Sequence, residues 1–512
     1  MRNIVAYIFA TLLLTGCNEV DVTSPRPNIL LIVADDLGYT DMGAYGSEIR
    51  TPNLDNLAAE GLLLTDFYAA PTCSPTRAML LSGTDHHLAG LGTMYGGWDT
   101  NQVDQRGYEA HLNQDVVSVS SILRDSGYHT YMAGKWHLGG APELQPPSRG
   151  FEQSFYLVQG GASHFSDRQG LTETVVVDYL ENGEVTALPS DFYSTNYYTD
   201  KMIGYIDQNR ADGNPFFGYL AYTSPHWPLQ VPTEDMDLYK GIYDGGYEKL
   251  REIRISRLRA LGIIDEATVA AMAPPYITSW QELSADEQKV EARKMELYAA
   301  MVENLDRNIG RVINHLKETG EYENTFIMFM SDNGAEGNDI GTLGDNEEWI
   351  PRSFDNSLEN MGKVNSYIHY GAGWAQASGG PFRDYKSFVS EGGIKVPAII
   401  HYADLDYDGD MDEEMMSVKD LAPTLLELAN TQHPGSIYKG REVFPISGKS
   451  LLPHLRNQQL PVYDADDING WELFGRQAIR QGSWKMVTQA PPFGNGKWQL
   501  FNLDDDPAET SD

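Results

Sequence analysis

Residues Asn28–Ala34, with the sequence Asn-Ile-Leu-Leu-Ile-Val-Ala, form an uninterrupted apolar run that is followed at once by Asp35 and Asp36. Such a run is typical of a strand in a parallel sheet, because that strand is buried on both faces. Since strand-like runs alternate with helical ones along the chain, we predict an α/β fold with a large mixed, mostly parallel sheet between layers of helices. The other candidate strands are residues 128–133, 216–222, 325–330 and 396–401.

Helical signals separate these strands. Residues 296–318 have strong helical periodicity and lead into the strand at 325–330, and residues 418–429 indicate a further helix. Thr51 and Pro52 suit an N-cap and a first helical position, and Gly61 suits a helix end. After about residue 440 the pattern changes to short strands separated by turns, which predicts a small antiparallel sheet.

The pattern divides the chain into four parts. Residues 1–17 indicate an export signal and 18–27 a polar tether, whereas 28–440 form the main domain and 441–512 a small C-terminal α+β subdomain. We expect a charged, mostly helical insertion at about 234–291. The acidic, turn-rich end at Asp512 leaves open whether the small subdomain is truncated.

The leader carries one of the two cysteines in the 512 residues. Arg2 precedes an apolar stretch too short to span a bilayer, and the stretch ends in Leu14-Thr15-Gly16-Cys17. This end resembles a bacterial lipobox, in which Cys17 is lipidated and the protein is exported, as a periplasmic or membrane-anchored lipoprotein of a bacterium. The alternative is an ordinary signal peptide that contains a cysteine.

The strongly negative net charge of the chain makes some classes of binding partner less plausible. There are 73 Asp and Glu against 37 Lys and Arg, which gives a formal net charge of -36. This argues against nucleic acid as a partner, because a nucleic-acid-binding protein needs a basic face. It also argues against long-range attraction of an anionic ligand. A site for an anion must therefore be built from a few local cations.

Polar residues follow four of the predicted strands, at the edge of an α/β sheet where ligands bind. Taken singly, each has a structural alternative: the acids and Asn333 suit turns or helix caps, and a lone His or Lys is often structural or solvated. Together, three carboxylates and an amide oxygen suit a hard cation such as calcium or magnesium, and no compact cluster of His and Cys indicates zinc. These residues are Asp35, Asp36, Lys135, His137, His226, Asp332 and Asn333, with Lys386 as a weaker candidate.

The second cysteine, Cys73, has no partner for a disulfide. Pro75 suits the first turn of a helix that runs to about Leu81, which places Cys73 at the positive end of the helix dipole. Arg77, one turn later, faces the same side. From these features alone, Cys73 is either an activated thiol nucleophile or a buried, inert cysteine.

At this point the residues resemble the type I, formylglycine-dependent sulfatases of the alkaline phosphatase superfamily, and the bacterial arylsulfatases in particular. The family signature Cys-x-Pro-x-Arg is present as Cys73-Ser74-Pro75-Thr76-Arg77. The segments at Asp35, Lys135, His226 and Asp332 match too, as do residues 371–377 and 391–397. The match extends over nearly the whole chain from Pro27, and it implies an alkaline-phosphatase-like fold.

The resemblance implies that a separate maturation enzyme oxidises Cys73 to formylglycine, which is hydrated to a gem-diol. It implies one Ca²⁺ per chain, bound by Asp35, Asp36, Asp332, Asn333 and residue 73, and a sulfate site lined by Arg77, Lys135, His137, His226 and Lys386. The implied reaction is hydrolysis of sulfate monoesters. Asp332 then accepts a proton from the nucleophile, His226 with Lys386 assists the leaving group, Lys135 neutralises sulfate, and His137 deprotonates the second hydroxyl.

Two other functions compete with this interpretation. One is hydrolysis of phosphate mono- or diesters on the same scaffold. The other is a non-catalytic lipoprotein that binds sulfated glycans, which the complete set of catalytic residues argues against. Whichever of these functions is right, we expect the membrane to be a partner only through a lipid anchor at Cys17.

Overall fold

The computed structural model describes residues 26–511, and its centre is a ten-stranded sheet. The predicted run Asn28–Ala34 is strand β1, in the middle of this sheet. The order across the sheet is β11 (Asp410–Asp412), β2 (Leu62–Leu64), β10 (Ala398–His401), β9 (Thr325–Ser331), β1, β8 (Phe216–Ala221), β4 (His129–Lys135), β5 (Gln153–Leu157), β6 (Tyr179–Glu181) and β7 (Glu184–Val185).

The five central strands, β9, β1, β8, β4 and β5, are all parallel. Ile32 of β1 lies opposite Leu220 of β8 on one side and Phe329 of β9 on the other. The edges are mixed: β10 is antiparallel to β9 and β2, and β6 is antiparallel to β5 and β7. The prediction of a mixed, mostly parallel sheet is therefore confirmed.

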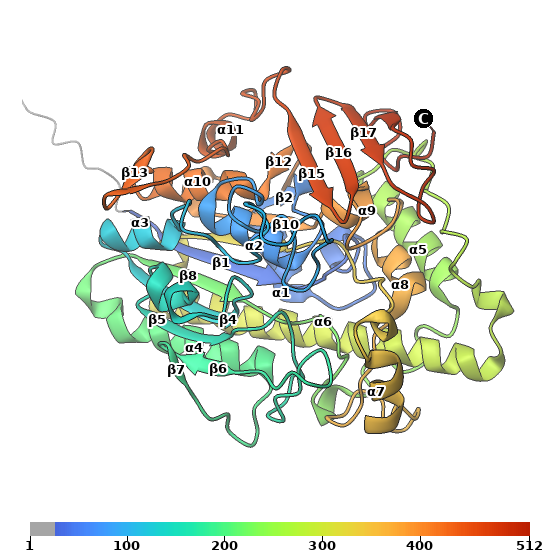
Figure 1. Ribbon diagram of the computed structural model, residues 1–512. Coiled ribbons are helices and arrows are strands. Elements are labelled where there is room, and N and C mark those ends of the chain that lie inside the picture. The colour runs from blue at the N-terminus through green and yellow to red at the C-terminus, as the bar shows by residue number, and fades with distance from the viewer. Residues whose placement is uncertain (1–25, 512) are drawn as a thin grey trace, which may run out of the picture.

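Helices cover both faces of the sheet (Figure 1). In that view α2, α3 and α10 lie above the sheet, and α4 and the long α6 lie below it. The helices are α1 (Pro52–Ala59), α2 (Cys73–Ser82), α3 (Val119–Asp125), α4 (Ser194–Asn209), α5 (Tyr247–Ala260), α6 (Ala285–Thr319), α7 (Asn346–Ser353), α8 (Gly371–Ser378), α9 (Glu391–Ile394), α10 (Leu421–Leu428) and α11 (Leu452–Arg456).

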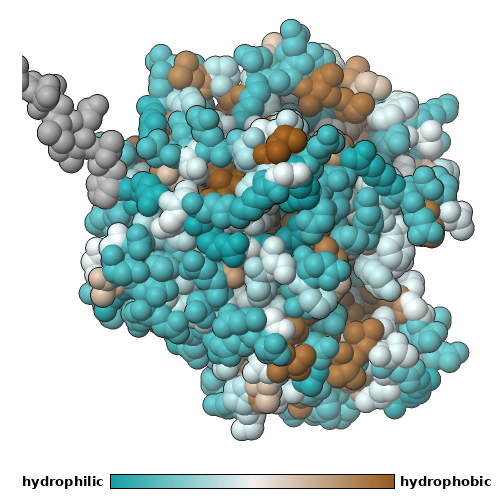
Figure 2. Space-filling view, turned by 60° about the vertical axis from the view of Figure 1, so that its left-hand side comes forward, coloured by the Kyte–Doolittle hydropathy of each residue, from teal (hydrophilic) through white to brown (hydrophobic). Residues whose placement is uncertain are grey.

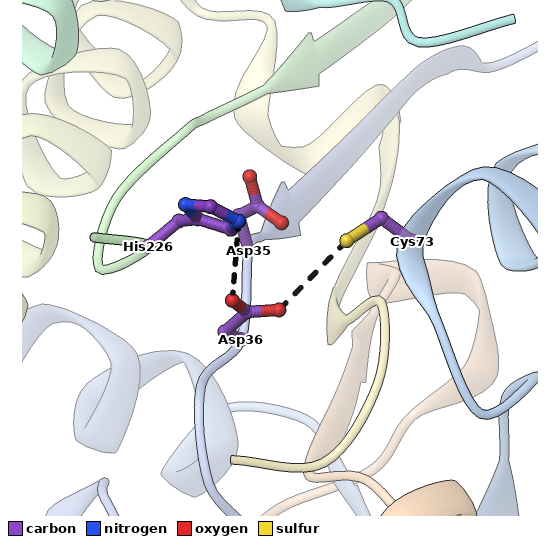
Figure 3. A group of neighbouring side chains, drawn as sticks. All are labelled: Asp35, Asp36, Cys73 and His226. Carbon is purple, nitrogen blue, oxygen red and sulfur yellow. Dashed lines mark hydrogen bonds and ion pairs between the residues drawn. The ribbon is translucent and has the colours of Figure 1, made fainter. Parts of the chain in front are cut away.

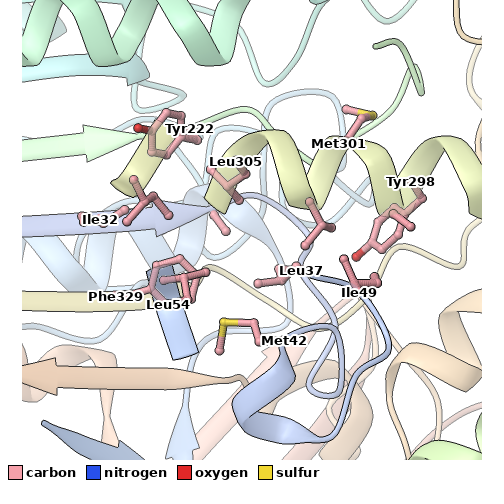
Figure 4. Close-up of a cluster of buried hydrophobic side chains, with 14 of the residues drawn as sticks. Ile32, Leu37, Met42, Ile49, Leu54, Tyr222, Tyr298, Met301, Leu305 and Phe329 are labelled. Atoms are coloured by element: carbon pink, nitrogen blue, oxygen red, sulfur yellow. The ribbon is translucent and has the colours of Figure 1, made fainter. Parts of the chain in front are cut away.

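Strand β1 explains why both layers are needed. Successive side chains of a strand point to opposite faces, and every residue of β1 is buried. Leu30 and Ile32 belong to the cluster that includes residues of α4 and α6, whereas Leu31 and Val33 belong to the cluster that includes residues of α2 and α10. Figure 4 shows part of the first cluster, in which residues of β1, α6 and the segment after β1 meet.

The C-terminal part contains the expected antiparallel sheet. Its four strands lie in sequence order, and Figure 1 places three of them at the top right. They are β15 (Asn469–Leu473), β16 (Arg476–Gln481), β17 (Trp484–Thr488) and β18 (Gln499–Asn502). Two further pairs are short: β3 (Phe67–Tyr68) with β12 (Met416–Ser417), and β13 (Ile437–Tyr438) with β14 (Arg441–Glu442).

A buried ion cluster joins this sheet to the main domain. Lys485 of β17 has no exposed side-chain surface, and its Nζ lies 2.6 Å from Glu391 Oε1 and 2.9 Å from Glu509 Oε1. The backbone N–H of Glu391 also donates to Glu509 Oε2. One lysine therefore compensates two enclosed carboxylates that come from different parts of the chain.

Several local expectations need correction. The hydroxyl of Thr51 accepts from the backbone N–H of Gly43 and does not cap α1, although Pro52 does begin that helix. Helix α6 begins at Ala285, well before residue 296, because Ser284 and Glu287 form a capping box there. Within residues 234–291, the α-helical parts are α5 and the first turns of α6, and the rest forms turns and short 3-10 segments.

Cys17, and with it the proposed lipid anchor, lies outside the described residues. Within residues 26–511, no helix is long and apolar enough to cross a membrane. The face shown in Figure 2 is mostly hydrophilic, with hydrophobic residues in separate small groups. This agrees with the formal net charge of -36.

The ion cluster at Lys485 allows a test of how the C-terminal sheet is held. Substitution Lys485→Met removes the nearest positive charge from Glu391 and Glu509, and loss of one partner from a buried ion pair costs about 3–5 kcal/mol. We expect chemical denaturation to show a loss of this size in the free energy of unfolding. The control Lys289→Met removes an exposed lysine paired with Asp286 and should leave stability unchanged. Equal stability of both variants would contradict this role.

Candidate active site

Four neighbouring parallel strands deliver the predicted polar residues to one edge of the sheet. Asp35 and Asp36 follow β1, His226 follows β8 and Asp332 follows β9. Lys135 is the last residue of β4. Figure 3 shows Asp35, Asp36, Cys73 and His226 facing one another at the end of β1. One ligand atom from each of these four side chains lies within 4.8 Å of those of the others.

Cys73 is the first residue of α2, and its side chain is buried. Its Sγ lies 3.8 Å from Asp36 Oδ1. Burial, and then the negative charge of Asp332, raise the pKa of this thiol well above its ordinary value. An unmodified Cys73 is therefore held as a neutral thiol, which is a poor nucleophile. This argues against the activated-thiol alternative.

Arg77 ties α2 to the strand ends. Its side chain is fully buried, with Nη2 2.7 Å and Nε 3.1 Å from Asp332 Oδ2. Its Nη1 donates to the carbonyl of Lys135 at 3.0 Å. The planar guanidinium can hold both acceptors at once because its donors point in fixed, different directions. Arg77 therefore fixes α2, β9 and the end of β4 relative to one another.

Two lysines complete the positive side of the site. Lys135 Nζ lies 2.9 and 2.7 Å from the two carboxylate oxygens of Asp35. Lys386 Nζ lies 2.8 Å from Asp36 Oδ1 and 2.9 Å from Glu336 Oε2. Burial would raise the pKa of Asp36, but Lys386 and His226 outweigh it and bring that pKa below its ordinary value. Asp36 is thus ionised.

The two histidines differ in how they are held. His226 Nδ1 lies 2.6 Å from the carbonyl of Trp227 and must donate to it, which leaves Nε2 facing Asp36 Oδ2 at 3.5 Å. Burial lowers the pKa of His226 to about 3, against the opposite influence of Asp36. His137 has a positive φ of 56°, and its buried Nδ1 has no partner among the described residues. Burial, Lys135 and Arg77 lower the pKa of His137 too.

A hard cation fits this set of oxygens. Asn333 Nδ2 donates to Asp36 Oδ1 at 2.7 Å, which leaves Asn333 Oδ1 buried and without a hydrogen-bond partner in the described part of the chain. Burial and the neighbouring charge of Asp35 raise the pKa of Asp332 to about 6. Crowded carboxylates and an unpaired amide oxygen are the donors that calcium binds.

Glycine allows the strand ends to approach this closely. A Cβ on Gly134, which has a φ of +122°, would lie 1.8 Å from the carbonyl oxygen of Ala221 at the end of β8. Since that atom belongs to the backbone, it cannot move aside cheaply. Gly134 therefore sets how closely Lys135 approaches the neighbouring strand.

The sequence and the fold were compared with known proteins. The sulfatase family model matches residues 27–431. The chain belongs to the sulfatase family. The model of the C-terminal region of N-sulphoglucosamine sulphohydrolase also matches residues 381–512. This sulfatase is accordingly an enzyme, a sulfuric ester hydrolase.

Two relatives are similar over most of their length. An uncharacterized sulfatase of Schizosaccharomyces pombe is 45% identical over 95% of this chain and 90% of its own. The arylsulfatase of Klebsiella aerogenes is 38% identical over 83% of this chain and 91% of its own. Among solved structures, Ps i-CgsB in complex with k-i-k-neocarrahexaose is 25% identical with a TM-score of 0.67, over 95% of this chain and 88% of that one.

Sequence reasoning missed one charged residue of the site, Glu336. It lies in the loop after β9, three residues beyond Asn333, and holds Lys386 Nζ opposite Asp36. The only sequence signal for Glu336 was its position in the same loop as Asp332. Its contact with Lys386 joins residues that are far apart in the chain and could not be derived from residue types. Tyr219 was missed as well; its hydroxyl lies 3.5 Å from Arg77 Nη1.

The substitution Arg77→Lys tests whether the guanidinium of Arg77 is needed to contact Asp332 and the carbonyl of Lys135 at the same time. Lysine keeps the charge but cannot contact Asp332 and the carbonyl of Lys135 in the same way. We expect kcat/KM for an aryl sulfate to fall by about 100-fold or more, mainly through kcat. Arg480→Lys is the matched control, since Arg480 is a mostly buried arginine paired with Asp66. Similar losses in the two variants would mean that Arg77 has only a structural role.

Proposed function

We propose that this sulfatase hydrolyses sulfate monoesters of the arylsulfatase type, using formylglycine made from Cys73 and one bound Ca²⁺. The observation that carries the proposal is the placement of Cys73. It begins α2 inside the Cys-x-Pro-x-Arg signature, 3.8 Å from Asp36 and beside the pair formed by Arg77 and Asp332. The similarity to the arylsulfatase of Klebsiella aerogenes supports the same reaction class.

Each of the two groups supplies one kind of chemistry. Formylglycine, as its hydrated gem-diol, supplies a hydroxyl that attacks sulfur and a second hydroxyl whose deprotonation releases sulfate. Asp35, Asp36, Asp332, Asn333 and residue 73 would hold calcium, which would supply positive charge for the oxygens that react. The unpaired Asn333 Oδ1 and the crowded carboxylates support this ligand set.

The cationic side chains offset the charge of the ester. Lys135 and Lys386 are both buried, and each forms ion pairs with a carboxylate of the proposed cation site. An ammonium in a water-poor site stabilises a sulfate oxygen much more than it would in water. Arg77 keeps residue 73 and Asp332 in fixed relative positions, so little reorganisation is needed as charge shifts.

Three groups move protons in this proposal. Asp332, which lies at the end of β9 and contacts Arg77, accepts a proton from a hydroxyl of residue 73. His226 donates a proton to the leaving oxygen, assisted by Lys386. A bound sulfate ester raises the pKa of His226 from its low value, because a neighbouring anion favours the imidazolium. His137, whose Nδ1 has no partner among the described residues, then takes a proton from the second hydroxyl.

We also propose that the enzyme is exported and that Cys73 is modified before the chain has finished folding. The leader at residues 1–17 and the lipobox-like Cys17 support a periplasmic or lipid-anchored location in a bacterium. The side chain of Cys73 is only 2% exposed, so a maturation enzyme must reach this segment before α2 packs against the sheet.

Modification of Cys73 is the deciding observation. Peptide mass spectrometry of active enzyme should show the thiol of residue 73 replaced by an aldehyde. Cys73→Ala should abolish hydrolysis of an aryl sulfate, and Cys73→Ser should lose multiple turnover, because it lacks the second hydroxyl. Cys17→Ser, which removes the other cysteine, should keep activity. An unmodified thiol in fully active enzyme, or faster hydrolysis of the matched aryl phosphate, would overturn the proposal.

The cation site predicts a second result, which does not depend on activity. Asn333→Ala removes one oxygen ligand, and we expect the affinity for Ca²⁺ in calorimetric titration to fall by about 10-fold or more. Asn346→Ala is the matched control, because Asn346 is also buried with an unpaired Oδ1 but lies in α7. Equal calcium affinity in the wild type and in Asn333→Ala would remove Asn333 from the site.

A further inference from the structure

A second cluster of possible metal ligands lies outside the active site, in the loop that follows α2. Asp85, His86 and His87 are consecutive, and each offers one ligand atom within 4.8 Å of the other two. None of them pairs with a residue of the catalytic site. Across the loop, Glu472 of β15 reaches His87, so the cluster lies between the main domain and the C-terminal sheet.

His86 is held in the form that binds a metal. Its side chain is buried, and its Nδ1 lies 2.8 Å from the carbonyl of Leu91. Since a carbonyl only accepts, Nδ1 carries the hydrogen and Nε2 carries the lone pair. That Nε2 is buried and has no hydrogen-bond partner among residues 26–511. A buried polar atom without a partner costs free energy, which a bound cation would recover.

His87 is oriented in the same manner. Its Nε2 lies 3.0 Å from Glu472 Oε2, an oxygen that also accepts from the hydroxyl of Tyr108. Its Nδ1 faces inward, 3.3 Å from Asp85 Oδ1. Histidines that bind a metal usually donate their outer N–H to a carboxylate or a backbone carbonyl. Glu472 and Leu91 provide these two acceptors.

The distances suit zinc. Ligands at about 2.0–2.1 Å around a tetrahedral zinc ion lie about 3.3 Å from one another. The separation of Asp85 Oδ1 and His87 Nδ1 already has this value, and one ring nitrogen of His86 lies within 4.8 Å of a ligand atom of each of these two residues. Two imidazoles and one carboxylate favour zinc over calcium, which prefers oxygen ligands.

We propose that Asp85, His86 and His87 bind one zinc ion, with Glu472 and the carbonyl of Leu91 as outer partners of the two histidines. Water takes the fourth position of a three-ligand zinc centre. This site is separate from the proposed calcium site. The sequence did not indicate it, because three adjacent residues lack the spacing of known zinc motifs and the decisive partner, Glu472, is far away in the chain.

A purely ionic alternative explains only part of the cluster. A protonated His87 between Asp85 and Glu472 satisfies both of its nitrogens; burial opposes this state, but the hydrogen bonds to the two carboxylates raise the pKa of His87 to about 9. Nothing in that arrangement pairs Nε2 of His86, however. Zinc in place of the proton satisfies both histidines.

Zinc at this position would also stabilise the loop at residues 93–114. Glu472 Oε2 accepts from Tyr108, and the carbonyl of Tyr108 accepts from Trp98 Nε1. The zinc ligands are therefore linked through Glu472 to the loop at 93–114. Binding should stabilise the contact between this loop and the C-terminal sheet, not the chemistry at residue 73.

The experiment is titration of the folded enzyme with Zn²⁺ alone, after the catalytic site has been saturated with excess Ca²⁺. We expect one tightly bound zinc ion per chain, measured by calorimetry and by metal analysis after gel filtration. His86→Gln and His87→Gln should lose this ion. Glu472→Gln should keep it with affinity lowered about 10- to 100-fold.

His129→Gln is the matched control, since His129 also lies between two carboxylates, Glu152 and Asp212, but has no second histidine beside it. It should retain the zinc ion. Equal zinc content in the wild type and in His86→Gln, or no binding at micromolar Zn²⁺, overturns the proposal.

X-ray absorption at the zinc edge tests the wild type directly, in case a variant fails to fold. We expect two imidazole nitrogens in the first coordination sphere at about 2.0–2.1 Å. A sphere made only of oxygen overturns the assignment. Neither result depends on formylglycine or on hydrolysis, so failure here leaves the proposed catalytic function intact.

Discussion

The buried contact between Arg77 and Asp332 is the constraint on which the rest of the catalytic site depends. It joins a helix to the end of a strand from the other half of the chain, and neither side chain has any exposed surface. Removing a single charge from such an environment leaves the other uncompensated, at a cost of several kcal/mol. Gly134 contributes to the same geometry, because it allows the end of β4 to approach β8 closely.

The fold could be predicted largely from the chain itself. The run at Asn28–Ala34 and the similar apolar runs after it identified β1, β4, β8 and β9 but not the fifth central parallel strand, β5, because strands covered on both faces leave little choice of residue type. The strands at the edges of the ten-stranded sheet were harder to predict. Strands β6 and β7 are short and partly exposed, so their composition does not distinguish them from turns. The early start of α6 was missed because a charged, solvent-facing first turn has weak apolar periodicity.

Some residues of the candidate active site could also be predicted from the sequence, and others could not. Asp35, Asp36, Lys135, His226 and Asp332 were predictable because the carboxyl ends of neighbouring parallel strands must meet. Glu336 and Glu472 were not, since their roles arise from packing between loops that are distant in sequence. The orientation of His226, fixed by the carbonyl of Trp227, depends on the local backbone path and could not be derived from residue types.

The position of Lys485 between Glu391 and Glu509 bears on the order of events during synthesis. Glu391 follows Lys386 closely in the chain, in a segment that also contacts the C-terminal region through Arg383 and Gln489. The segment that carries Lys386 therefore gains its last buried contacts only after residue 509 has been synthesised. Until then most of the sheet can be complete, while the segment that places Lys386 beside Asp36 is not.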